Sequence, residues 1–348
     1  MIENKTNKLL KENDFATDVR PYYNRIIEEE ISYRNTKKWN NDNLMKQPFE
    51  IALEDVFLLI NDFVKDLEVK NKDYAQKILD VLQGKNKNVI VKWCVNPFKV
   101  KTNPKGHVKR VNRGTNKEKT EVYIPIGKKK FKEKKIETSF HQIIDAVHLI
   151  AHSVSQRNRS AKLIPHKIEE AQEIESVFVE KLFINYLSVY KDVVADNMRF
   201  FGQKDINEKF IESMVREYFE TKHDELLQNV SFVIYEYENL QEMKNKKDKR
   251  SVYKQVVGEV FARKLLKNFK SNPDYTMLSF ALFVNRSCEI RSLNEMAEEL
   301  FPDVLSQKIN RRRQNKKLLS SYEIVLENVA DDIKHETFAI KETNIIKK

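Results

Sequence analysis

Glycine, proline and cysteine are all scarce in this chain of 348 residues, which contains 6 Gly, 8 Pro and 2 Cys. Because glycine and proline are the main breakers of helices, their scarcity predicts long helices and few tight turns. The two cysteines, Cys94 and Cys288, provide neither a disulfide framework nor a Cys-x-x-Cys pair. We therefore expect an intracellular, reducing environment.

Long hydrophobic runs are also missing. No stretch of about 18 apolar residues occurs, so the sequence predicts no transmembrane helix and no membrane partner. The first residues, MIENKTNKLLKEND, lack the apolar core of a signal peptide, which favours a cytoplasmic location. A nucleotide-binding glycine loop, a Ser/His/Asp series and a cysteine nucleophile are equally absent as motifs.

The positive charge of the chain is concentrated in one segment. Between Lys99 and Lys135 lie 14 Lys/Arg and 3 Glu, an excess equal to the net charge of +11 for the whole chain. Aromatic and histidine side chains are interspersed, a composition that suits phosphate contacts with occasional base stacking. A solvated surface loop has the same composition. We predict a nucleic acid or another polyanion as partner, contacted by Lys105, Lys109, Arg110, Arg113, Lys128, Lys129 and Lys130.

The pattern of apolar residues predicts a mainly α fold with a small β-hairpin or short sheet at about residues 88–126. NVIVKWCV (88–95) and TEVYIPI (120–126) are short and β-branched, which is typical of strands. Elsewhere the apolar spacing is helical. We expect a helical N-terminal region at 1–84, short strands with a basic loop at 85–136, a helical domain at 137–330 and a tail at 331–348.

One predicted helix carries an unusual polar stripe. Residues 140–156 read FHQIIDAVHLIAHSVSQ, and His141, Asp145, His148 and His152 fall on one face of a helix with 3.6 residues per turn. Much of the remaining helix surface is apolar, so burial is expected, and buried polar groups need partners. The stripe therefore predicts either a ligand site or histidines that cap and pair within the core.

A metal ion is the ligand that this spacing favours. His148 and His152 are four residues apart, so both imidazoles can reach one ion from the same side of the helix. A third protein ligand is available on the next predicted helix, where Glu173, Glu175 and Glu180 follow His152 by 21, 23 and 28 residues.

The segments HLIAHSVSQ (148–156) and EIESVFVE (173–180) resemble the zinc helix HELGHSxHS and the following helix EVASTxNE of the thimet oligopeptidase/oligoendopeptidase F family of zinc metallopeptidases. The resemblance covers about residues 120–305 and is weak outside these two helices. It implies a multi-helix metallopeptidase-like domain that binds zinc through His148, His152 and a glutamate. By motif the glutamate is Glu173, whereas Glu175 fits the spacing about as well.

The departures from this family pattern imply a protein that does not hydrolyse peptides. Leu149 occupies the position of the glutamate that polarises the metal-bound water. Asp145 offers a carboxylate one helical turn earlier. Members of the family also use a His- and Tyr-rich segment to stabilise the transition state, and only Tyr253 matches it here. We therefore expect a catalytically degenerate, metallopeptidase-like protein that acts by binding a peptide, a protein or a nucleic acid.

A second functional hypothesis comes from residues 292–317. This segment has the outline of a helix-turn-helix, with a break at 301–303 and a basic second helix. It predicts a DNA-binding regulator of a phage or mobile element, although two packed helices with a basic solvent face fit the same pattern. The candidate contacts are Lys308, Arg311, Arg312 and Arg313.

Overall fold

The computed structural model of the chain describes residues 43–95, 106–111, 119–129, 135–155, 165–238 and 246–286. The helix-turn-helix candidate and the predicted tail lie outside these residues. The same holds for the predicted contacts Lys105, Arg113, Lys130, Lys308, Arg311, Arg312 and Arg313. The backbone of Arg110 is described, but its side chain is not.

The chain divides into two compact units, one formed by residues 41–223 with 257–300 and the other by 1–40, 224–256 and 301–348. The first, called the larger unit below, holds most of the described elements. In the second, the described residues are the end of one helix and the start of another. The four regions predicted from the sequence remain a prediction.

The predicted mainly α fold with a short sheet is confirmed. After a short 3-10 turn at Leu44–Lys46, the helices are α3 (Leu53–Lys70), α4 (Lys72–Leu82), α6 (Phe140–Ser155), α7 (Pro165–Val189), α8 (Lys191–Phe200), α9 (Glu208–Glu238), α10 (Lys246–Ser271) and α11 (Pro273–Arg286). The strands are β1 (Phe49–Ala52), β2 (Val89–Cys94), β3 (His107–Val111), β4 (Lys119–Pro125), β5 (Lys128–Lys129) and β6 (Lys135–Thr138). None of the described helices is long and apolar enough to cross a membrane.

The strands form two small sheets, in the orders β2-β4-β3 and β1-β6-β5. Strands β2 and β4 match the two predicted strands, but they pair in parallel and therefore do not form a hairpin. Parallel neighbours need a long connection, and this connection contains β3, which pairs antiparallel with β4. Strand β3 lies in the segment that the sequence predicts to be a basic loop. A strand is not predicted there because its sequence, HVKRV, is mostly polar.

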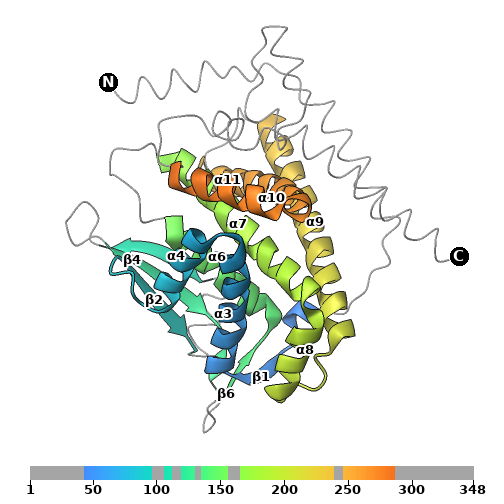
Figure 1. Cartoon of the computed structure of the whole chain (residues 1–348). Helices are drawn as coiled ribbons and strands as arrows, with labels where there is room; N and C mark the ends of the chain where they lie inside the picture. Colours follow the sequence, from blue (N-terminus) through green and yellow to red (C-terminus); the bar gives the residue numbers. More distant parts are fainter. Residues whose placement is uncertain are drawn as a thin grey trace, which may run out of the picture. The chain divides into compact units, whose positions relative to one another are not determined.

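Helix α7 runs through the core of the larger unit. Every residue from Ala171 to Ile184 is buried, including several charged ones. Figure 1 shows α7 beside α6, which makes the most extensive contact with it. Ring contacts such as Phe63–Phe183 and Phe178–Phe280 join α7 to α3 and α11. Over this stretch α7 has no solvent face, so its polar side chains must lie against other elements, and these contacts define the candidate site.

Candidate metal centre

Helix α6 presents His148 and His152 on consecutive turns of one face. Ser139 caps the helix, accepting hydrogen bonds from the backbone N–H of Gln142 at its side chain and of Ile143 at its carbonyl oxygen. The opposite side of α6 is buried and packs against strand β4. The two imidazole rings meet edge to face with their centroids 4.7 Å apart. This packing fixes both histidines toward α7.

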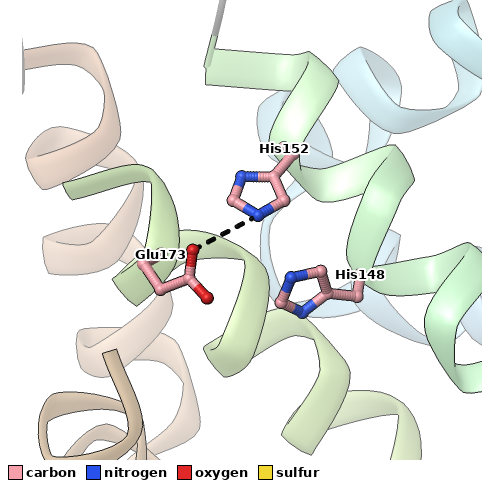
Figure 2. Close-up of side chains that lie close together, drawn as sticks. All are labelled: His148, His152 and Glu173. Atoms are coloured by element: carbon pink, nitrogen blue, oxygen red, sulfur yellow. Dashed lines mark ion pairs between the residues drawn. The ribbon is translucent and has the colours of Figure 1, made fainter. Parts of the chain in front are cut away.

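Glu173 on α7 completes a three-residue group with the two histidines, as Figure 2 shows. One ligand atom from each residue lies within 4.8 Å of the other two. His152 Nε2 is 3.5 Å from Glu173 Oε2, which is longer than an ordinary N–H···O hydrogen bond. Two ligands of one tetrahedral zinc ion are separated by about 3.3–3.5 Å, given metal–ligand bonds near 2.0–2.1 Å. These three residues could hold a metal ion.

Glu175, the alternative third ligand, is engaged elsewhere. It is buried, and its Oε1 accepts a hydrogen bond of 2.9 Å from the hydroxyl of Tyr74 on α4. On α7 a shift of two residues turns the side chain by about 200°. Glu173 and Glu175 therefore point to different neighbours, and Glu173 is the glutamate that meets the histidines.

Glu180, two turns further along α7, forms a hydrogen bond with His148. Its Oε2 lies 2.8 Å from His148 Nδ1, while its Oε1 accepts a hydrogen bond from the Tyr218 hydroxyl at 2.8 Å. Lys222 Nζ forms an ion pair with the same Oε1 at 3.2 Å. With Nδ1 bound to a carboxylate, His148 presents Nε2 for a metal, the arrangement by which ligating histidines are usually oriented.

The charges around Glu180 favour its ionised form. Burial alone would raise the pKa of this carboxyl, but Lys222 and the hydrogen bond with His148 hold the pKa well below its usual range. For His148, burial acts to lower the pKa, and the hydrogen bond and charge of Glu180 outweigh it and raise the pKa overall. The pair therefore keeps a negative charge on Glu180 and a donating Nδ1–H on His148.

Helix α10 approaches Glu173 so closely that a side chain at Gly258 would have to displace its neighbours. A Cβ placed on Gly258 would lie 2.8 Å from Glu173 Cγ and 3.1 Å from its carbonyl carbon and oxygen. Glycine within a helix costs roughly 0.5–1 kcal/mol relative to alanine. The close crossing of α10 and α7 at Glu173 is the structural reason for it.

The position next to His148 is apolar in the structure as well. Leu149 is buried, and its Cδ1 lies 2.6 Å from the place of a Cβ on Gly106, so it packs against the start of β3. Asp145 lies instead beside His141, with 3.8 Å between Oδ1 and Nδ1. Burial raises the pKa of the Asp145 carboxyl, and His141 opposes this effect only in part.

The predicted basic contacts that the structure describes lie on strands. Lys109 is exposed on β3, and Lys128 and Lys129 are exposed on β5. None of the three belongs to the group of residues that could hold a metal ion.

Four residues shape the site in ways that the sequence does not predict. Glu180 is predicted only as an alternative third ligand, and Tyr218, Lys222 and Gly258 are not among the predicted site residues. The sequence does mark Gly258 as a position of interest, because a glycine in the middle of a predicted helix is unusual in a chain with so few glycines. Nothing in the sequence indicates Tyr218 or Lys222, since only the tertiary fold brings α9 to α7.

Comparisons with known proteins do not assign the chain to a family. No family model, curated protein or solved structure matches it. The resemblance to zinc metallopeptidases therefore stays a prediction from the two sequence motifs.

Proposed function

We propose that this chain binds a divalent transition-metal ion, expected to be zinc, and acts by binding a ligand rather than by hydrolysing it. The observation that carries this proposal is the convergence of His148, His152 and Glu173 across two buried helices. Glu180 supports it by orienting His148 from behind.

The donor set agrees with a zinc site that keeps a position open. Two imidazole nitrogens and one carboxylate oxygen are typical of catalytic zinc sites, in which the fourth position takes water or a ligand. When bound, the ion would supply a Lewis acid for a carbonyl or carboxylate oxygen. The protein's own part is to hold the two histidines on one face of α6 and the glutamate opposite them on α7.

Leu149 is the reason to propose binding instead of hydrolysis. In the resembled family a glutamate at this position serves as the general base, and such a base typically contributes about 10²–10⁴-fold to the rate. Leu149 offers no proton acceptor and packs against Gly106. A peptide is the ligand class that we propose, because the resembled zinc helix belongs to proteins that bind peptides.

Metal content tests the site directly. The full chain, purified without a histidine tag, is expected to carry about one metal ion per chain by inductively coupled plasma mass spectrometry. His148→Ala and Glu173→Gln are expected to lose it. His141→Ala is the matched control, because His141 lies on the same helix but outside the group. Wild-type protein that stays metal-free after dialysis against zinc would overturn the proposal.

Peptide binding and turnover test the second half. We expect a fluorescent peptide library to bind the zinc-loaded chain more tightly than His148→Ala, with no cleavage. Peptide cleavage by wild type that disappears in His148→Ala would refute the loss of catalysis.

A further inference from the structure

A second candidate site lies on the β2-β4-β3 sheet, away from the metal centre. Along β4, Thr120, Val122 and Ile124 are buried, and they alternate with Lys119, Glu121 and Tyr123 on the opposite face. Because side chains alternate along a strand, the buried set faces α6, which packs against β4. The other face of the sheet is polar and partly exposed.

Three side chains form a row across this polar face. The strand register places Lys92 of β2 and His107 of β3 on either side of Tyr123. The rings of His107 and Tyr123 are stacked, with centroids 4.6 Å apart and an angle of 14° between their planes. Lys92 Nζ lies 5.0 Å from the centre of the Tyr123 ring and donates a hydrogen bond of 3.2 Å to its hydroxyl. The row is therefore an ordered aromatic stack with a cation beside it.

Lysines dominate the charge around this row. Lys109 and Lys119 are exposed on the same face, Lys109 in register with Glu121 and Lys119 two residues before it. Glu121 itself is neutralised by Lys92 at 2.7 Å. Exposed Lys128 and Lys129 extend the positive charge, because the backbone N–H of Lys129 bonds to Val95 at the end of β2.

We propose that this face, defined by Lys92, His107, Lys109, Lys119 and Tyr123 and called the sheet face below, binds single-stranded nucleic acid. Exposed His107 at the end of the stack offers a ring on which an unpaired base can stack, and the lysines lie where the phosphates would run. Stacking on aromatic side chains combined with backbone cations is how single strands are bound without sequence specificity.

The geometry favours a single strand over a duplex or an acidic protein. In a duplex the bases are already stacked on one another, so they cannot use a ring on a flat sheet. An acidic peptide would use the lysines but would gain little from two ordered, stacked rings. The inference goes beyond the proposed metal function and does not depend on it, since the sheet face contains none of the metal-binding residues.

Fluorescence anisotropy with the full chain tests the proposal. The probes are labelled oligothymidine, oligouridine and a mixed-sequence duplex, each of about 16 nucleotides per strand, measured between about 50 and 200 mM salt. We expect both single strands to bind more tightly than the duplex. The ratio of the DNA and RNA affinities then shows which of the two is preferred.

Two variants separate stacking from charge. His107→Ala is expected to weaken single-strand binding about 10-fold, since one stacked base contributes about 1–3 kcal/mol, while the salt dependence stays unchanged. Lys109→Gln with Lys119→Gln is expected to flatten the slope of log K against log salt by up to about 1.4. The control Lys204→Gln with Lys209→Gln removes the same charge from exposed positions of another region.

The proposal fails under any of three outcomes, each measured on variants whose thermal unfolding matches wild type. Neither single strand binds, His107→Ala binds as wild type does, or the duplex and polyglutamate compete as well as a single strand. The last outcome would define a general polyanion surface. Loss of metal binding in His148→Ala with unchanged oligonucleotide binding would confirm that the two sites are separate.

Discussion

Gly258→Ala offers a sharp test of how the helices position Glu173. The new methyl group would lie 2.8 Å from Glu173 Cγ and 3.1 Å from its carbonyl group, whereas carbon atoms in contact are normally about 3.5–4.0 Å apart. Either α10 moves outward by several tenths of an ångström or the Glu173 side chain turns away from the histidines.

The expected magnitudes differ for stability and for metal affinity. Replacing glycine by alanine within a helix stabilises it by about 1 kcal/mol, and overpacking a core costs about 1–3 kcal/mol. The free energy of unfolding should therefore fall by at most about 2 kcal/mol. Displacing a ligand should be more serious for the metal, because perturbing even the groups behind a ligand costs about 10–100-fold in affinity.

Competition with a chromophoric zinc chelator gives the affinity, and urea unfolding of the metal-free protein gives the stability. Lys267→Ala is the matched control, because it replaces an exposed residue of the same helix. Gly258→Ala that binds zinc as tightly as wild type, with unchanged stability, would refute the reasoning, since the crossing would then tolerate a side chain.

Four further predictions follow from the same contacts. Glu173→Gln should lose the metal while Glu175→Gln keeps it, as measured by metal content, because Glu175 bonds to Tyr74 instead; equal losses would contradict the assignment. Glu180→Gln should weaken zinc binding about 10-fold or more in a chelator competition, because His148 loses its carboxylate partner. Glu259→Gln should lower the free energy of unfolding in urea by about 3 kcal/mol, because the buried Lys181 and the partly buried Arg263 lose their counter-charge; a loss below 1 kcal/mol, compared with Lys267→Ala, would contradict this. Burial would raise the pKa of Glu259, but Lys181 and Arg263 lower it below that of an unfolded chain, which is about 4.3 for Glu. The ion pairs of Glu259 therefore stabilise the fold above about pH 4.3, and this stabilisation is lost as the pH falls through the lowered pKa. Glu259→Gln should lack this part of the pH dependence.

The local patterns of the sequence predicted the mainly helical fold and the strands β2 and β4, whereas the other strands and the long-range contacts required the structure. Helical spacing and the His-x-x-x-His motif located α6 and the two histidines. The choice between Glu173 and Glu175 stayed open, because a spacing along the chain does not specify how α7 is rotated about its axis. In the structure Glu173 lies beside the two histidines. Glu175 instead accepts a hydrogen bond from Tyr74, which lies about a hundred residues earlier in the sequence.

The sheet illustrates the same limit. The two apolar strands were visible as β-branched runs, but their parallel pairing was not, because it depends on β3 in the intervening segment. On strand β3, His107 and Lys109 are exposed and Val108 is half-buried, and polar residues outnumber apolar ones in its sequence. A short strand of this kind has no hydrophobic signal that distinguishes it from a loop.

The complete burial of the middle of α7 has a kinetic consequence. The segment from Ala171 to Ile184 has no solvent face, so the backbone that carries Glu173 and Glu180 can move only if the core of the larger unit opens. His148 and His152 belong to a helix that is only partly covered at these positions. Metal entry and release should therefore follow movements of α6 against a stationary α7, and the exchange rate should track amide hydrogen exchange in α6 rather than in α7.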